Sequence, residues 1–304
     1  MARTRYPADR GLSSRIVLTL FLLGLLYVVF VVVLSQFVNL WLVLVIAGGF
    51  LFFQYFFSDR IALFAMRARE VSPQQAPELH QLIDRLCALA DMPKPRVAIA
   101  DSDVPNAFAT GRNQKHAVVC VTTGILRRLS EPELEAVLSH ELSHVAHRDV
   151  AVMTIASFLG ILAGFVVRAA IYGGAYGGFG RSSDNRDNTG AVILLVVVAS
   201  AVVYAISFLL TRALSRYREL SADRAGAILI GRPSLLAAAL VKVSSEMARI
   251  PTRDLRAAEP LNAFFFAPAL ARGASFSSLF HTHPPLERRL EQLARLEAQL
   301  GRQA

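Results

Sequence analysis

Long uncharged apolar runs alternate with polar stretches along this chain. Two runs follow one another near the N-terminus, and two more lie mid-chain. The four runs are Ile16–Leu34, Val38–Phe57, Ala151–Val167 and Ala191–Leu210. A helix rises about 1.5 Å per residue, so roughly 20 apolar residues cross the hydrocarbon layer of a bilayer. The pattern therefore predicts four transmembrane helices arranged as two hairpins.

Two alternatives exist for these runs. The first run could be a cleaved signal peptide, but no small-residue cleavage site follows it and a second apolar run comes at once. The second pair could be buried helices of a soluble domain, because Arg168 interrupts the third run. Arg168 lies near the end of that run, where a long side chain can reach the membrane surface. We therefore expect four spans.

Arginines flank the four runs unevenly. They cluster before the first run, after the second and after the fourth, whereas the first hairpin turn has no Arg or Lys. These flanking residues are Arg3, Arg5, Arg10, Arg15, Arg60, Arg67, Arg69, Arg212, Arg216 and Arg218. By the positive-inside rule, both termini and the polar mass face the cytoplasm. The predicted divisions are residues 1–57 (N-terminal segment and first hairpin), 58–150 (first part of a cytoplasmic domain), 151–210 (second hairpin with an extracytoplasmic loop) and 211–304 (second part of that domain).

The polar stretches predict a mainly α-helical domain with a small β-sheet. Apolar residues recur at helical spacing over Pro77–Met92. Glu131–His147 is a stronger helix, because Ser130 can cap it and acidic residues fill its first turn. Further helices are expected over Leu214–Leu229 and Leu286–Leu300, and short strands over Arg96–Ala100 and Ala117–Thr122.

The composition agrees with a membrane protein. The apolar fraction is 54%, the mean hydropathy is +0.44 and only 18% of residues are charged. These values argue against a disordered chain, a small disulfide scaffold and a purely soluble domain. The net charge is +9, and the arginines cluster beside the apolar runs. Anionic lipid headgroups, and not nucleic acid, are therefore the expected partner. Cys87 and Cys120 lack CxxC spacing and are expected to be reduced core thiols.

A five-residue motif lies on the helix predicted from Glu131. It reads His140-Glu141-Leu142-Ser143-His144, and residues four apart on a helix point in directions only about 40° apart. Two imidazoles on one face can bind one Zn²⁺, and Glu141 beside them can take a proton from a water. The alternative is a surface helix with incidental histidines. We expect a zinc site with an acid–base carboxylate.

A second pair of acidic residues lies just past the fourth run. A catalytic zinc needs a third protein ligand and one open position. Glu219 and Asp223 are four residues apart, which permits Glu219 to bind the metal while Asp223 accepts the remaining N–H of a ligating histidine. The same spacing is typical of a solvated helix face with arginine neighbours, and spacing alone does not decide between the two.

The remaining histidines are not predicted to bind the metal. His147 lies too close to His144, because the metzincin arrangement needs its third histidine farther on, after a glycine turn. We expect His147 to be a polar helix-end residue, with Asp149 as a supporting partner near the site. His80, His116 and His281 have no metal spacing and are expected at the surface or in packing.

Taken in order along the chain, these motifs resemble the HtpX-type membrane metalloproteases, relatives of the CaaX prenyl endopeptidases. The segments that carry the resemblance are His140–Asp149, Glu219–Asp223, Asn106–Gly111 before the strand Ala117–Thr122, and the His-Pro…Arg element within His281–Leu290. The zinc motif alone occurs in many peptidases, but the ordered combination is much more specific and covers nearly the whole chain. His147 departs from the family pattern, which more often has Asn there.

The resemblance implies a gluzincin-like zinc-peptidase domain that binds one Zn²⁺, with Glu219 as the third ligand and Asp223 as a supporting carboxylate. It also implies that Asn106, Ala107 and Phe108 lie on an edge strand over the cleft and pair with an extended substrate. On physical grounds alone, an ordinary strand start explains this segment equally well.

The resemblance implies roles for two residues near the C-terminus. His283 would sit near the cleft and steady the tetrahedral oxyanion, which makes it a catalytic candidate beside Glu141. Arg289 would support the site through carboxylate or backbone contacts. The alternative for both is a structural His-Pro turn followed by a solvated helix.

The implied function is that of a zinc-dependent endopeptidase in the cell inner membrane, which cleaves membrane or misfolded proteins from the cytoplasmic side during stress-related quality control. Glu141 takes the proton of the attacking water and delivers it to the leaving amine, so no acyl-enzyme forms. The expected partners are membrane lipids and unfolded or membrane protein substrates, and a homo-oligomer is compatible with the sequence. Phe264-Phe265-Phe266, within Glu259–Ser278, could line a substrate-facing surface or be buried by packing.

Two rival functions are weaker. An intramembrane protease would bring charges such as Glu131, Glu133 and Glu135 to membrane depth, which is costly. A membrane scaffold or transporter with a structural zinc site would need a closed, cysteine-rich ligand set, and the sequence has none.

Overall fold

The computed structural model of the chain describes residues 10–35, 40–175, 186–249 and 284–302. They belong to two compact units. One unit comprises Met1–Leu12, Phe56–Ala151 and Ser215–Ala304, and the other comprises Ser13–Tyr55 and Val152–Leu214. Each unit is therefore built from segments that are distant in the sequence.

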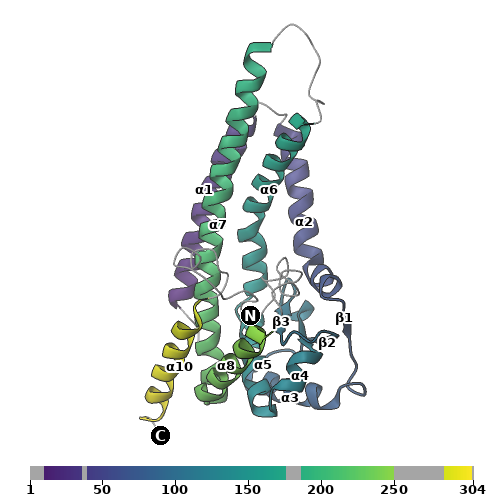
Figure 1. Ribbon diagram of the computed structural model, residues 1–304, viewed down its shortest axis with the longest axis vertical. Coiled ribbons are helices and arrows are strands. Elements are labelled where there is room, and N and C mark those ends of the chain that lie inside the picture. Colours follow the sequence, from purple (N-terminus) through teal and green to yellow (C-terminus); the bar gives the residue numbers. More distant parts are fainter. Residues whose placement is uncertain (1–9, 36–39, 176–185, 250–283, 303–304) are drawn as a thin grey trace. The chain divides into compact units, whose positions relative to one another are not determined.

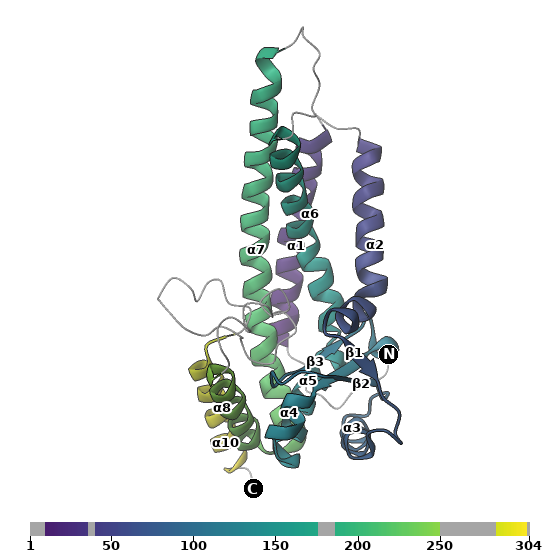
Figure 2. The ribbon, with the colours of Figure 1, turned by 45° about the vertical axis from the view of Figure 1, so that its right-hand side comes forward.

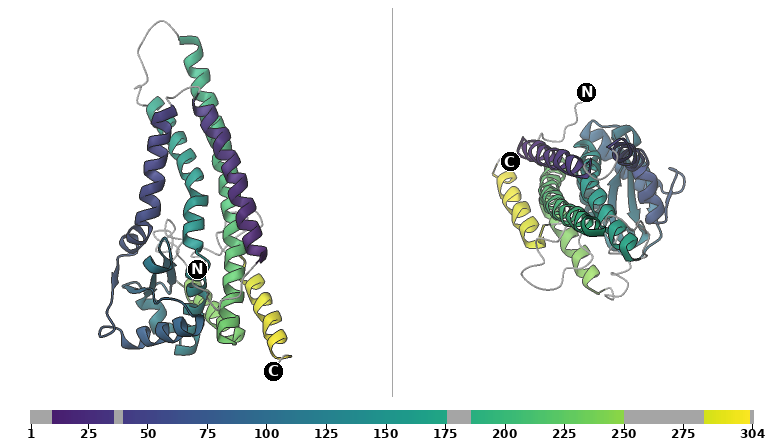
Figure 3. Two further views of the ribbon diagram at one scale, coloured as in Figure 1. Left: turned by 180° about the vertical axis from the view of Figure 1, so that it is seen from behind. Right: turned by 90° about the horizontal axis from the view of Figure 1, so that it is seen from above.

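Helices occupy all four predicted apolar runs. They are α1 (Arg10–Ser35), α2 (Leu40–Ala65), α6 (Asp149–Ala175) and α7 (Arg186–Ile230). Figure 3 shows these helices side by side. Each contributes to one apolar cluster, with Phe30, Ala47, Phe158 and Val203 among its buried members. Within the described ranges, Arg10–Val32 and Leu194–Ile230 are long and apolar enough to cross a membrane. A third span results only if Glu131–Ala146 and Ala151–Gly164, which meet at a bend of 65°, are counted as one.

The helix predicted over Leu214–Leu229 is the last part of α7. Nothing between the fourth apolar run and this segment interrupts the helix, and α7 continues to Ile230. Gly231, with φ +68°, and Pro233 end it as predicted. The acidic pair Glu219 and Asp223 therefore lies on one long helix.

The small β-sheet has four strands in the order β1 (Ala68–Glu70), β2 (Arg96–Ala100), β4 (Val118–Thr122) and β3 (Ala107–Thr110). Figure 1 labels β1, β2 and β3. β2 and β4 are parallel, and the other two pairs are antiparallel. β3 lies at one edge of the sheet. The sequence predicts β2 and β4, and the family resemblance predicts the edge strand; β1 is too short to carry a pattern.

Both faces of the sheet are covered by apolar side chains. One face adjoins the main core, which gathers residues of α3 (Pro77–Ala90), α5 (Glu131–Ala146), α8 (Pro233–Arg249) and α10 (Leu286–Leu300). α8 and α10 lie side by side (Figure 2). The other face holds Phe108 and Cys120 against Ala62, at the end of α2. Cys87 and Cys120 are buried and form no disulfide.

The sequence does not predict α8. Pro233 looks like the end of the preceding helix, but it is also the first residue of the next one, where its missing N–H costs nothing. The predicted helix from Glu131 is present as α5. At its start, the Glu133 carboxylate accepts from the backbone N–H of Ser130 at 2.8 Å and from Lys242 of α8 at 2.9 Å.

Candidate metal centre

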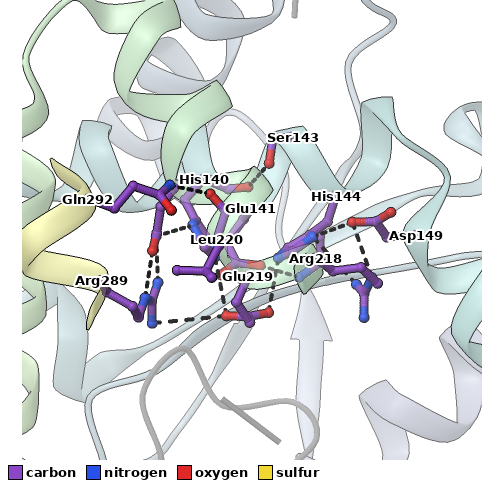
Figure 4. A network of polar contacts seen from close by, with 12 residues as sticks. His140, Glu141, Ser143, His144, Asp149, Arg218, Glu219, Leu220, Arg289 and Gln292 are labelled. Atoms are coloured by element: carbon purple, nitrogen blue, oxygen red, sulfur yellow. Dashed lines mark hydrogen bonds and ion pairs between the residues drawn. The ribbon is translucent and has the colours of Figure 1, made fainter. Parts of the chain in front are cut away.

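Three side chains predicted to bind a metal lie together in the structure. His140 and His144 from α5 and Glu219 from α7 are buried, and they offer ligand atoms within 4.8 Å of one another (Figure 4). Glu219 Oε2 lies 3.7 Å from His140 Nε2, and Glu219 Oε1 lies 3.4 Å from His144 Nε2. Both imidazoles thus turn the same ring nitrogen toward one carboxylate, as ligands of a single ion would.

The other ring nitrogen of each histidine faces a carboxylate. His140 Nδ1 lies 2.9 Å from Asp223 Oδ1, and His144 Nδ1 lies 2.7 Å from Asp149 Oδ2. An Nδ1–H directed at a carboxylate leaves the Nε2 lone pair free for a metal. Two imidazoles and one carboxylate form a donor set typical of catalytic zinc. The residues present therefore fit the zinc ion that the sequence predicts.

Arg289 enters this site from α10. Its Nε and Nη2 donate to the two oxygens of Asp223 at 2.7 and 2.6 Å, and its Nη1 lies 3.9 Å from Glu219 Oε2. The residue is only 1% exposed, so it does not lie on a solvated helix face. Gln292, one turn later, donates to the Leu220 carbonyl at 2.6 Å (Figure 4). The C-terminal helix is thereby part of the site.

Glu141 contacts the edge strand. Its Oε2 accepts a hydrogen bond from the Ala109 N–H at 3.0 Å. The backbone of Asn106 bonds to Thr122 of the neighbouring strand, and the backbone direction alternates along a strand. Ala107 and Ala109 therefore turn their backbone polar groups away from β4, toward the open edge.

Asn106 and Phe108, two of the three strand residues predicted from the resemblance, have other surroundings. Asn106 is buried immediately before β3. Phe108 packs on the opposite side, in the cluster with Cys120. Ala109, which is not among the residues predicted from the sequence, is the strand residue in contact with Glu141. No sequence signal distinguishes it, because its backbone makes the contact.

The buried charges shift one another's protonation. Burial raises the pKa of the Glu141 carboxyl to about 8, and the nearby Glu219 charge acts in the same direction. For His144, burial favours the neutral ring, but the bonds to Asp149 and Glu219 outweigh it and raise the pKa to about 9. A divalent cation held by the cluster would lower both pKa values, because positive charge favours the carboxylate and disfavours the imidazolium.

Gly226 permits close contact between α7 and α5. A Cβ at Gly226 would lie 2.8 Å from the backbone nitrogen of His140, and Ser139 Oγ donates to the Gly226 carbonyl at 3.0 Å. The two helices therefore meet backbone to backbone beside the first histidine. A glycine within a helical pattern is the signal that could have identified this contact from the sequence.

Replacing Gly226 with Ala is expected to destabilise the fold by about 1–3 kcal/mol, the usual cost of overpacking. It should also weaken zinc binding, because α7 must move away from α5 and carries Glu219 with it. Thermal unfolding and competition with a zinc chelator measure the two effects. Gly301→Ala is the matched control, since Gly301 has φ −65° and a Cβ there would lie 3.4 Å from its nearest neighbour, the Glu297 carbonyl oxygen. Wild-type stability and zinc affinity in Gly226→Ala would contradict this account.

His283 lies outside the described residues, as do His281 and Phe264-Phe265-Phe266. His80 and His116 are both away from the cluster: His80 bonds to the Val71 carbonyl at 3.0 Å, and His116 bonds to Asn113. Their expected packing and surface positions agree with these contacts.

Comparisons with known proteins agree in matching this chain to peptidases. Residues 73–297 match the model of the family described as Peptidase family M48. The chain is 58% identical to "Protease HtpX homolog 1" of Streptomyces coelicolor, over 98% of this chain and 97% of the relative. It is 56% identical to "Protease HtpX homolog" of Moorella thermoacetica, over 98% of each chain.

A more distant likeness is structural. The crystal structure of S. mikatae Ste24p superposes with a TM-score of 0.52 at 20% sequence identity. The match covers 89% of this chain and 62% of that chain. At this identity the likeness concerns the fold alone, and the fold it supports is the helical arrangement with a small sheet described above.

Proposed function

Since the chain belongs to peptidase family M48 and is an HtpX-type metallopeptidase, we propose that it is a zinc-dependent endopeptidase that cleaves membrane or misfolded proteins from the cytoplasmic side of the membrane. One observation carries the proposal: two imidazoles and Glu219 converge within 4.8 Å, with Glu141 on the same helix as the imidazoles. A structural zinc site needs no further buried carboxylate beside its ligands, whereas a catalytic site needs an acid–base group such as Glu141.

In this proposal His140, His144 and Glu219 hold the zinc ion. When bound, zinc supplies Lewis-acid chemistry, which acidifies water and polarises a carbonyl group. Glu141 takes the proton of the attacking water and passes it to the leaving amine, so water is the nucleophile and no acyl-enzyme forms. Its hydrogen bond with the Ala109 N–H orients the carboxylate for this transfer.

The supporting residues act on the ligands. Asp223 fixes the tautomer of His140, and Arg289 binds Asp223 and offsets part of the negative charge that Asp223 and Glu219 carry together. We further propose that His283 approaches the cleft and donates to the developing oxyanion. That role rests on the family resemblance.

The substrate is proposed to add to the open edge of the sheet. The outward backbone groups of Ala107 and the carbonyl of Ala109, whose N–H is bonded to Glu141, can pair with an extended peptide, which brings its scissile bond toward Glu141. Recognition through the backbone requires an unfolded substrate segment and selects little among the side chains of that segment. This fits a role in quality control of damaged membrane proteins.

We propose that all four apolar helices span the cell inner membrane, with both termini and the catalytic unit in the cytoplasm and lipids as their partners. The arginine distribution and the two helices that meet the length and apolarity criteria support this topology. A single cysteine introduced between Ala175 and Arg186 should react with a membrane-impermeant maleimide added outside cells. A cysteine at Glu131, which is exposed, should react only after lysis. The reverse pattern would contradict the proposed orientation.

The alternative of a scaffold or transporter with structural zinc is not favoured, since the relatives at high identity are named proteases. The test is incubation of the detergent-purified chain with an unfolded protein, with products identified by mass spectrometry. An endopeptidase yields internal fragments that disappear with a zinc chelator. Removal of single terminal residues would indicate an exopeptidase, and zinc binding without any cleavage would revive the structural alternative.

A further inference from the structure

His144 is held by a buried pair of charged side chains on the side opposite its metal-facing nitrogen. Its Nδ1 lies 2.7 Å from Asp149 Oδ2, and the same oxygen lies 3.2 Å from Nε of Arg218. Nη2 of Arg218 lies 3.4 Å from the same ring nitrogen (Figure 4). Asp149 is 1% exposed and Arg218 is 9% exposed. The three groups form one compact cluster, although the sequence places Arg218 among the charges that flank a membrane span.

Asp149 reaches the imidazole because the chain turns between α5 and α6. In an unbroken helix, five positions would rotate Asp149 about 140° away from His144. Instead Arg148 adopts the left-handed conformation, with φ +59°, and α6 begins at Asp149. The contact between Asp149 and His144 therefore depends on what fixes the start of α6.

A buried carboxylate requires compensation for the water that it loses. Among the described residues, Asp149 Oδ1 has no hydrogen-bond partner, so the compensation is concentrated at Oδ2. There the guanidinium of Arg218 supplies a full positive charge, and the imidazole supplies one N–H. Without that charge, Asp149 would be more stable turned toward solvent than turned toward the ring.

The other histidine has the same support. Its carboxylate, Asp223, is bound through both oxygens by Arg289. In each case a histidine is held by a carboxylate, and the carboxylate by an arginine. Arg218 directly precedes Glu219 on α7. One turn of this helix therefore supplies the candidate ligand Glu219 and also holds Asp149, which supports the candidate ligand His144.

We propose that Arg218 is a positioning residue that anchors Asp149 and, through it, fixes the tautomer and orientation of His144 for metal binding. The inference rests on the proposed function, because it takes His144 as a zinc ligand. Loss of a group that orients a metal-binding histidine lowers metal affinity by roughly 10–100-fold. The same loss is expected for Arg218→Gln, although Arg218 touches neither the metal nor the substrate.

The test measures zinc affinity of the full-length protein in detergent by competition with a chromophoric chelator. Arg218→Gln should bind zinc about 10–100-fold more weakly, and its Co²⁺-substituted form should show a shifted visible spectrum, because the ligand geometry changes. Arg224→Gln is the matched control, an exposed arginine on the same helix, and should retain wild-type values. Wild-type zinc affinity and cobalt spectrum in Arg218→Gln would overturn the proposal.

A double-mutant cycle with Asp149→Asn identifies the route. If Arg218 acts through Asp149, adding Arg218→Gln to Asp149→Asn should lower zinc affinity by less than about threefold further. Two full, additive losses would overturn the proposal. Should Arg218→Gln fail to fold, Arg218→Lys replaces it: the ammonium keeps the charge but lacks the planar fork, so a few-fold loss and a shifted cobalt spectrum are expected. Unchanged values in Arg218→Lys would then count against the role.

The two proposals fail in different ways. A wild-type chain that binds zinc but cleaves no unfolded protein overturns the proposed endopeptidase function. A wild-type chain that cleaves, with unaltered zinc affinity in Arg218→Gln, overturns only the role of Arg218.

Discussion

Glu141→Gln is expected to lower the cleavage rate by about 10²–10⁴-fold, the usual contribution of a general acid–base group, while zinc stays bound. Glutamine has nearly the same shape, and its amide oxygen can still accept the hydrogen bond from the Ala109 N–H. It cannot take the proton of a water. The loss should therefore appear in kcat, with KM and zinc content close to wild type.

The matched control for this experiment is Glu131→Gln. Glu131 is on the same helix, but its side chain is 72% exposed and pairs with the exposed Arg85. Its cleavage rate should be unchanged. Equal cleavage by wild type and Glu141→Gln would point to a contaminating protease, and a zinc-free Glu141→Gln protein would show that this residue acts on the metal site.

Glu219→Ala is expected to abolish stable zinc binding. The substitution removes one of the three proposed ligands and leaves Arg289 with Asp223 but without Glu219, whose Oε2 lies 3.9 Å from its Nη1. We expect zinc affinity to fall by more than about 100-fold, beyond the effect of losing an outer supporting group. Zinc per chain after gel filtration, measured by atomic emission, tests this directly.

The control is Glu291→Ala on α10, where the side chain is 66% exposed and lies in a surface ion pair. It should retain its zinc. His140→Ala should behave as Glu219→Ala does. Full zinc occupancy in Glu219→Ala would mean that the third ligand is a different residue, and His140→Ala would then show whether the histidine pair binds the metal at all.

The positions of the histidines were predictable because the information is local. His140 and His144 are on one helix, so helical geometry alone places them on one face. The acidic pair is different. Glu219 and Asp223 lie near the end of α7, so α6 and the apolar part of α7 separate them from the histidines in sequence, and only the folded chain brings the two pairs together. Helical spacing identified Glu219 and Asp223 as candidates, and the tertiary contacts show that both lie beside the histidines.

Several features depended on contacts between distant segments and could not be derived from spacing. Arg218 follows a long apolar run, so its charge suggests a membrane flank, yet its side chain is buried against Asp149. Ala109 acts through its backbone N–H, which no side-chain pattern reveals. Gly226 carried a signal, but its meaning depends on which helix passes it.

Arg289 illustrates what the family resemblance added. Physical reasoning on the sequence allowed a solvated helix face, because the neighbouring positions of α10 are charged. The resemblance predicted contacts that support the site, and the structure has Arg289 in a two-bond contact with Asp223. A single buried arginine cannot be told from the exposed charged residues beside it until its partner from another segment is known.

We propose that one metal ion at His140, His144 and Glu219 makes this chain an endopeptidase. The most direct measurement is a titration of the metal-free, detergent-purified protein with Zn²⁺ while cleavage of an unfolded protein is recorded. We expect a rate that rises from zero and reaches its plateau at one zinc per chain. Cleavage that is already maximal before zinc is added, or zinc bound to saturation with no cleavage, would contradict it.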